Sequence, residues 1–279
     1  MNTSFRDPDL QREFDENGYV VADCLDAGEV ELLRNVWRDL PNDLGAGHFT
    51  ATLFSADLGY REQVHTRLRR VFQSKVEATL DDYRICYCSY VHKPARSAQG
   101  VVELHQDWTF VDESIFQPIA YWCPLVDVNS ANGCLRVVPG SHKLNRMPRG
   151  LGQPRFPYSN LLGCLERDYM REVPMKAGQA FIYAQSLFHS SPPNTSGEDR
   201  LVAGALAIPS AADLLFLMKD PAATEFSVYR VPDNFYSRFI VGTVPDPQWR
   251  IGSVKDEFEP VSEDTLRRTL GSLHATRSA

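Results

Sequence analysis

The sequence predicts a mainly β protein, a barrel or sandwich with flanking helices. Short runs rich in β-branched and aromatic residues, bounded by Gly, Pro and Asn, follow one another from residue 83 to residue 210. The chain before residue 83 instead shows the spacing of amphipathic helices. At 279 residues the chain has a length at which barrels and sandwiches commonly form one unit.

Residues 1–82 are expected to form a mainly helical support. The Asp-Pro pair at 7–8 has the residue types of an N-cap and a first helical position, and this helix should end near Gly18. The run YVVAD that follows predicts a short strand. Asp26, with Glu29 three residues later, resembles a capping box that begins a second helix. A third, amphipathic helix is predicted over REQVHTRLRRVFQSKVEATL.

The barrel core is expected over residues 83–210. Its predicted strands are YRICYCSYVH, QPIAYWCPLVDV, GCLRVVPG, AGQAFIYA, SLFHSS and RLVAGALAIP. An insertion over 145–170 interrupts them, and a long insertion between strands is often a lid or a binding loop. Residues 211–279 should add strands and, over SEDTLRRTLGSLH, a capped helix. Because no linker is visible, the chain is interpreted as one domain over 1–279.

Composition and charge exclude several classes of protein. The formal net charge is −7 and the pI about 5.5, which argues against a nucleic-acid partner. The sequence contains no apolar run long enough to span a membrane, and its polar N-terminus lacks the features of a secretory signal. Six cysteines without a C-x-x-C pair indicate buried thiols in a reducing compartment. We therefore expect a cytoplasmic protein, a monomer or homodimer, without nucleic-acid or membrane partners.

The stretch VELHQDWTF carries the first sign of chemistry. His105 and Asp107 stand two residues apart, so on a strand they project to the same face and can coordinate one ion. A second histidine would complete the facial triad that is diagnostic of non-haem Fe(II) oxygenases. The candidates for this third ligand are His48, His65, His92, His142, His189 and His274.

His189 is the strongest of these candidates. It ends a short apolar run and precedes a polar loop, and Arg200 begins the next predicted strand eleven residues later. The planar guanidinium of arginine suits bidentate capture of a carboxylate. Three protein ligands with open positions and a carboxylate clamp are what a bidentate 2-oxo acid requires.

Several motifs, taken in order, resemble one known family. They are LHQD at 104–107, Trp122 followed by NGCLRVVPGSHK at 132–143, and HSSPPNTSGEDR at 189–200. A lone H-x-D is weak, but the ordered set is specific, and the sequence looks like the phytanoyl-CoA dioxygenase family of Fe(II)/2-oxoglutarate-dependent oxygenases. The resemblance covers about residues 83–208.

The resemblance implies a double-stranded β-helix, that is, a cupin-like jelly-roll barrel, and a set of site residues. The iron ligands would be His105, Asp107 and His189, and these would also be the catalytic residues. For 2-oxoglutarate, Arg200 would pair with the distal carboxylate and Ser191 would assist it. The remaining cosubstrate contacts implied by the family are Trp122, as a lining aromatic, and Ser89.

The implied reaction uses Fe(II), 2-oxoglutarate and O2, and hydroxylates an unactivated C–H bond while releasing succinate and CO2. Halogenases of this superfamily replace the carboxylate ligand with a small residue, so the presence of Asp107 favours a hydroxylase. The same cofactors could instead serve desaturation, epoxidation or cyclisation. A cupin-like metal enzyme, or a ligand-binding barrel that does not use 2-oxoglutarate, is the second alternative.

The substrate is expected to be a small organic molecule, such as an amino-acid derivative, a lipid-like acid or a natural-product intermediate. A CoA thioester stays open, although no concentrated basic patch is visible for its phosphates. The residues predicted to contact the substrate follow the H-x-D motif or lie in the C-terminal part. They are Trp108, Thr109, Phe110, Phe235 and Arg238.

Overall fold

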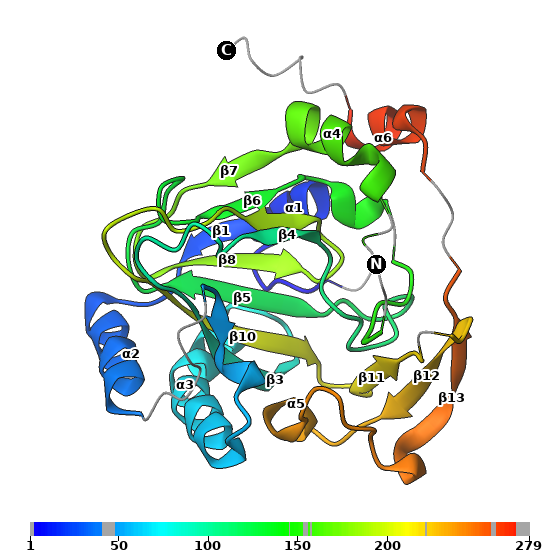
Figure 1. The fold of residues 1–279 in the computed structure, drawn as a ribbon, viewed down its shortest axis with the longest axis horizontal. Coiled ribbons are helices and arrows are strands. Elements are labelled where there is room, and N and C mark those ends of the chain that lie inside the picture. The colour runs from blue at the N-terminus through cyan, green and yellow to red at the C-terminus, as the bar shows by residue number, and fades with distance from the viewer. Residues whose placement is uncertain are drawn as a thin grey trace.

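Two antiparallel sheets facing each other form the centre of the molecule, which is a computed structural model (Figure 1). Helices flank the sheets, so the prediction of a mainly β, jelly-roll fold is confirmed. The structure describes residues 3–40, 48–144, 146–152, 156, 158–220, 222–257 and 261–271.

The larger sheet separates two environments. Its six strands are, in spatial order, β1 (Tyr19–Asp23), β8 (Gln179–Ala184), β5 (Ile119–Pro124), β10 (Arg200–Pro209), β3 (Tyr83–Lys93) and β2 (Thr50–Ala51). Because side chains alternate along a strand, Tyr121 faces the helical layer whereas its neighbour Trp122 faces the second sheet. The same alternation separates Ile182 from Phe181 on β8.

The smaller sheet contributes the opposite wall of the barrel. Its four strands are, in spatial order, β4 (Val102–His105), β9 (His189–Ser191), β6 (Leu135–Val137) and β7 (Arg171–Val173). The predicted strand SLFHSS is extended only over its last three residues, because a turn closed by Leu187 N–H and Ala184 O precedes it. This turn connects β8 of one sheet to β9 of the other.

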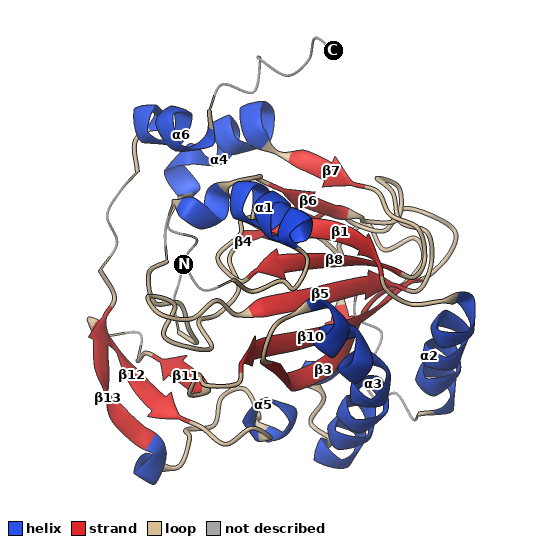
Figure 2. Cartoon of the chain, turned by 180° about the vertical axis from the view of Figure 1, so that it is seen from behind, coloured by secondary structure: helices blue, strands red, loops and turns tan. Residues whose placement is uncertain are grey.

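Three N-terminal helices support the larger sheet from outside, as Figure 2 shows from behind. They are α1 (Pro8–Asn17), α2 (Ala27–Asp39) and α3 (Leu58–Thr79). The Asp7 carboxylate accepts N–H groups of the first turn of α1, and Gly18 ends that helix at φ 80°. Both hydrogen bonds of the Asp26–Glu29 capping box are present. The N-terminal elements thus form where their capping residues predict them.

The insertion over 145–170 is partly helical. Its short helix α4 (Leu162–Cys164) lies between single helical turns at Ser159–Leu161 and Leu165–Tyr169. Buried side chains of this segment pack with Phe188 and with Leu266 of α6 (Glu263–Leu270). Its residues 145, 153–155 and 157 lie outside the described residues, and its role as a lid stays a prediction.

The C-terminal part adds a third sheet beside the barrel (Figure 1). The elements of this sheet are β11 (Leu215–Met218), β12 (Glu225–Arg230) and β13 (Arg250–Lys255), with α5 (Phe235–Arg238) and a turn at Pro247–Trp249. The predicted C-terminal helix is α6, and its N-cap is Ser262. Both strands and a helix were expected here.

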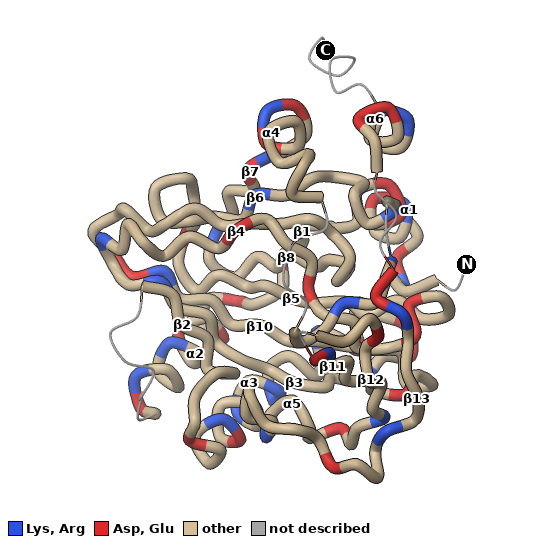
Figure 3. Tube along the Cα trace, turned by 45° about the vertical axis from the view of Figure 1, so that its right-hand side comes forward, with Lys and Arg blue, Asp and Glu red and all other residues tan. Residues whose placement is uncertain are grey.

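Basic and acidic residues lie close together in several elements of the described part of the chain. Lys and Arg occur together with Asp and Glu in the helical turn Leu165–Tyr169, on α6 and along the C-terminal sheet (Figure 3). In the described part of the chain, no helix has both the length and the apolar character needed to cross a bilayer.

Candidate metal and cosubstrate site

Strand pairing brings the three predicted ligands together between the two sheets. His105 ends β4 and His189 begins β9, and the two residues are direct antiparallel partners. Their imidazole centroids lie 4.2 Å apart. Asp107 follows β4, with Oδ1 3.7 Å from His105 Nε2 and Oδ2 3.8 Å from His189 Nε2. All the potential ligand atoms lie within 4.8 Å of one another, which fits a single metal ion.

Both imidazoles are oriented in the same way, by a hydrogen bond to the backbone carbonyl two residues earlier. His105 Nδ1 lies 2.8 Å from the carbonyl oxygen of Glu103, and His189 Nδ1 lies 2.9 Å from that of Leu187. A carbonyl only accepts, so each Nδ1 carries the proton and each Nε2 lone pair is free for a metal. Burial, together with the neighbouring His105, lowers the pKa of His189 to about 4, so this ring is neutral at physiological pH.

Arg200, the carboxylate clamp that the sequence predicted, is buried and contacts Ser191, two residues after His189 on β9. Its guanidinium donates to Gly133 O at 2.8 Å and to Ser191 Oγ at 3.2 Å, and it lies 5.4 Å from the centroid of Trp122. Within the described residues, Arg200 Nε has no hydrogen-bond partner. Burial lowers the pKa of this arginine to about 9. A buried donor without a partner is costly, and a carboxylate ligand would satisfy it.

Lys93 is a second buried cation that the sequence analysis did not assign to the site. It is paired with Arg200 across β3 and β10, and its side chain is fully buried. Lys93 Nζ donates to Ser191 Oγ at 2.7 Å, Ser191 O at 3.0 Å and Pro192 O at 2.6 Å. Burial, and then the charge of Arg200, lowers the pKa of Lys93 to about 7. In the described part of the chain, neither cation forms an ion pair with an acidic side chain.

Ser89 and Trp122 lie on the same inner face of the larger sheet as Arg200. Both residues are direct partners of Gly204, on opposite sides of β10, and Gly204 stands four residues after Arg200. Residues two apart on a strand share a face, so Gly204 and its partners Ser89 and Trp122 lie on the same face as Arg200. They lie further along β10, away from the loop that precedes Arg200. Trp122 thus lies against Arg200, and Ser89 lies further along the same face. Their role in binding stays a prediction.

Three of the five predicted substrate contacts, namely Trp108, Phe110 and Phe235, belong to one connected set of aromatic rings. Trp108, Thr109 and Phe110 directly follow Asp107; Thr109 is hydrogen-bonded to Arg149, and Phe110 packs on aromatic rings of the barrel. Phe235 belongs to an aromatic cluster with other rings of the C-terminal part. Arg238 is exposed and lies 3.8 Å from a carboxylate oxygen of Glu62. No ring contact or hydrogen bond among the described residues joins Arg238 to the triad.

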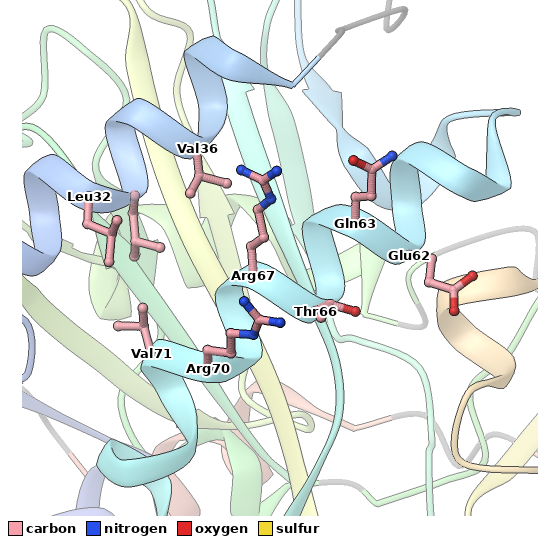
Figure 4. Close-up of a pocket in the computed structure, with 9 residues that line it drawn as sticks. Leu32, Val36, Glu62, Gln63, Thr66, Arg67, Arg70 and Val71 are labelled. Carbon is pink, nitrogen blue, oxygen red and sulfur yellow. The ribbon is translucent and has the colours of Figure 1, made fainter.

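Two grooves lie on the outer surface, away from the triad. One, of about 480 Å³, runs between α2 and α3 and is lined by Leu32, Val36, Arg67, Arg70 and Val71 among others (Figure 4). The other, of about 360 Å³, lies in the C-terminal part around Phe235 and Trp249. Neither groove contains a residue of the triad or its two cations.

A jelly-roll barrel that brings two histidines and one carboxylate together has the arrangement of non-haem Fe(II) oxygenases. The chain belongs to the phytanoyl-CoA dioxygenase family, whose model matches residues 14–202. A curated relative, "Phytanoyl-CoA dioxygenase domain-containing protein 1" of Danio rerio, is 33% identical over 114 residues, which are 37% of this chain and 38% of that protein. The Arabidopsis thaliana "Phytanoyl-CoA dioxygenase" is 33% identical over 109 residues, or 36% of each chain. The matches thus span little more than a third of these relatives.

Solved structures share the fold at low sequence identity. The α-ketoglutarate-dependent epimerase SnoN from nogalamycin biosynthesis aligns with TM-score 0.55 and 20% identity, over 92% of this chain and 93% of that one. The carbocyclase SnoK from the same biosynthesis gives 0.53 and 20%, over 75% and 86%. HygX from Streptomyces hygroscopicus, with nickel and 2-oxoglutarate bound, gives 0.52 and 18%, over 74% and 88%. The predicted cofactors agree with this family of dioxygenases.

Proposed function

We propose that this protein is an Fe(II)- and 2-oxoglutarate-dependent dioxygenase that hydroxylates a C–H bond of a small organic molecule. One observation carries the proposal. Two buried cations, Lys93 and Arg200, contact Ser191, which follows the candidate ligand His189 by two residues on β9, and within the described residues no acidic side chain forms an ion pair with them. A doubly charged ligand that binds a metal at one end and a cation at the other matches this arrangement.

His105, Asp107 and His189 would hold the metal. When bound, Fe(II) and 2-oxoglutarate supply oxygen activation, with oxidative decarboxylation of the 2-oxo acid to succinate and CO2. The protein keeps both Nε2 atoms unprotonated through the carbonyl groups that receive the Nδ1 protons. Three protein ligands leave positions open for the 2-oxo acid and for O2.

Arg200, assisted by Ser191, would bind the distal carboxylate of 2-oxoglutarate. Lys93, whose three Nζ protons go to oxygens of Ser191 and of the proline after it, would act through its charge. Arg200 brings an unused donor, and Lys93 brings a second positive charge on the other side of Ser191 Oγ. Charge-assisted bonds to a carboxylate are roughly twice as strong as neutral ones, and a buried setting strengthens them further. Trp122 and Ser89 would form the wall of this pocket.

The substrate would bind next to Asp107, against Trp108, Thr109 and Phe110. Most of the side chains around Trp108 and Phe110 are aromatic. Such a lining favours an organic substrate of moderate size over a highly charged one. With a metal bound, the carboxylate of Asp107 would take the position that a halide would need, so hydroxylation is favoured over halogenation. Phe235 contacts Phe216 and Tyr236, and these two rings also contact Trp108 and Phe110, so Phe235 would extend the same aromatic wall. Arg238, three residues later, would add a positive charge for an acidic group of the substrate.

Other outcomes share these cofactors. Desaturation, epoxidation and cyclisation begin from the same activated site, and two proteins of this fold are described as a carbocyclase and an epimerase. A cupin-like metal enzyme or binding barrel without 2-oxoglutarate would have no use for two buried cations in contact with the strand that carries His189. We therefore rank it below the 2-oxoglutarate enzymes.

The deciding experiment measures succinate. Wild-type protein, supplied with Fe(II), ascorbate, 2-oxoglutarate and O2, should release succinate, and a screened substrate should increase this release and gain the mass of one oxygen atom. His105→Ala and Asp107→Ala should abolish the release while circular dichroism stays unchanged. His92→Ala removes a histidine that pairs with Asp199 outside the site, and it is the matched control. Wild-type protein that binds Fe(II) but never converts 2-oxoglutarate would refute the proposal.

A further inference from the structure

The carboxylate of Asp107 has a hydrogen-bond partner that is not itself a predicted ligand. Tyr183, from β8, donates its hydroxyl proton to Asp107 Oδ2 over 2.8 Å. The phenol ring also contacts His189 edge-on, with 5.1 Å between the ring centroids. Tyr183 is itself buried on the inner face of the larger sheet, where Phe181 packs beside it. Its position is therefore fixed by the barrel core.

The main chain of Asp107 is held by a second group. Arg149 Nε donates to the Asp107 carbonyl oxygen at 2.7 Å, and another nitrogen of the same guanidinium lies 2.5 Å from Glu113 Oε1. The side chains of this ion pair are only 4% and 5% exposed. Two further hydrogen bonds join the same segments, since Thr109 N–H donates to Arg149 O and Arg149 N–H donates to Thr109 Oγ1. The loop that carries Asp107 is thus tied to the start of the 145–170 insertion.

We propose that Tyr183 and Arg149 are positioning residues that hold Asp107 for coordination through one oxygen. The inference rests on the proposed function. The phenol engages Oδ2, and this leaves Oδ1, 3.7 Å from His105 Nε2, as the oxygen that accepts no hydrogen bond from the described residues. A carboxylate bound through both oxygens would occupy a further metal position. One-oxygen binding keeps that position open for the 2-oxo acid or O2.

Metal titration without turnover tests this inference. Co(II) is the probe, because its visible spectrum reports coordination number and its affinity can be measured in the absence of O2. Tyr183→Phe should weaken Co(II) binding ten- to a hundredfold, as loss of a partner of a metal ligand commonly does, and should change the spectrum. A merely structural role for the hydroxyl would lower thermal stability but leave the spectrum of the bound metal unchanged.

Tyr90→Phe is the matched control. Tyr90 also donates a buried hydroxyl over 2.7 Å, to Leu33 O, but on the outer face of the same sheet. The Tyr90→Phe variant should lose about as much stability as Tyr183→Phe but keep the wild-type Co(II) affinity within twofold. A folded Tyr183→Phe with wild-type affinity and spectrum overturns the role of Tyr183.

Arg149→Lys decides the case if Tyr183→Phe does not fold, and it tests the second positioning residue in any event. Lysine keeps a positive charge beside Glu113 but cannot also reach the Asp107 carbonyl with a planar fork. We expect weaker Co(II) binding in this variant, and wild-type affinity would overturn the role of Arg149. If wild-type protein binds neither Co(II) nor Fe(II), the proposed function is wrong. If wild-type protein binds the metal and both variants bind it equally well, the proposed function stands and only this inference is wrong.

Discussion

Lys93 and Arg200 show how single residues define the ligand of this site. Like charges buried side by side repel each other and lose hydration, so an anion between or beside them is strongly favoured. We expect Arg200→Gln to raise the Kd for 2-oxoglutarate at least tenfold, because a charge-assisted hydrogen bond contributes about 1.5–3 kcal/mol. Calorimetry on Mn(II)-loaded protein measures this, and Arg67→Gln on the surface of α3 is the control. An unchanged Kd in Arg200→Gln contradicts the clamp.

The lowered pKa of Lys93 gives 2-oxoglutarate binding a pH dependence. In the free protein, Lys93 is charged below its pKa of about 7, and a bound carboxylate favours the charged form. Binding therefore takes up a proton above pH 7, so the Kd should rise between pH 7 and pH 9, by at most about tenfold per pH unit. Lys93→Met should bind more weakly at pH 6 and lose this dependence. A wild-type Kd that is flat over this range would exclude a contribution of the Lys93 charge to binding.

The metal ligands could be predicted from sequence because strand alternation and the order of the motifs both mark them. His105 and Asp107 are two apart, and His189 precedes Arg200 at the family spacing. Lys93 carries no such local mark. Its only signal is a lysine ending an apolar strand, and its partnership with Arg200 depends on the register between β3 and β10, which the sequence does not reveal. Tyr183 was missed for the same reason.

At the scale of elements, the end of α1 packs against the turn after β6, and His142 lies in the contact between them. His142 is buried against Gly18, where an added Cβ would lie only 2.4 Å from its Nδ1. Phe14 of α1 packs on the same ring. Gly18 therefore has two reasons to be glycine, its left-handed φ and this close approach.

This contact makes stability depend on pH. Burial, and then the charges of Lys143 and Arg146, lowers the pKa of His142 from 6.5 to about 4. The unfolded chain therefore binds a proton that the folded chain excludes, and stability is lost as pH falls from about 6.5 to 4, by at most about 3 kcal/mol from this residue. His142→Gln should lower the slope of unfolding free energy against pH in urea titrations. Some pH dependence should remain in this variant, because the pKa values of His65 and His189 are also lowered in the folded protein. If the pH dependence of the unfolding free energy equals that of the wild type, His142 does not contribute to it.

Elements with strong local signals were predictable, and those defined by packing were not. Asp7, Gly18 and Asp26 mark helix ends by chemistry that acts within a few residues. The insertion was expected as a lid-like loop, yet its helical turns are stabilised by contacts with Phe188 and Leu266, far away in sequence. Such contacts leave no periodic pattern in a short segment.

At the scale of the whole molecule, the C-terminal sheet lies beyond residues 14–202, which match the family, and must be held to the barrel by contacts of its own. Arg61 of α3 provides one of them. Its guanidinium, almost fully buried, donates to Tyr236 O and Phe239 O, both at 2.6 Å, at the end of α5. Tyr236 in turn donates to Leu215 O of β11. A single side chain thus joins the helical layer to the third sheet.

We expect Arg61→Met to lower the free energy of unfolding by about 2–4 kcal/mol, since two charge-assisted hydrogen bonds are lost and two buried carbonyls are left without donors. Urea denaturation measures the loss, with Arg70→Met on the exposed face of the same helix as the control, expected within about 0.5 kcal/mol of wild type. Because α5 and β11 depend on this contact, early proteolytic cuts should move into the part around α5. Because His105, Asp107 and His189 belong to the barrel, Co(II) affinity should persist in the folded variant. If Arg61→Met were as stable as the control, the other contacts of the C-terminal part, such as the hydrogen bond from Leu215 N to Phe110 O and the aromatic packing, would suffice to hold it.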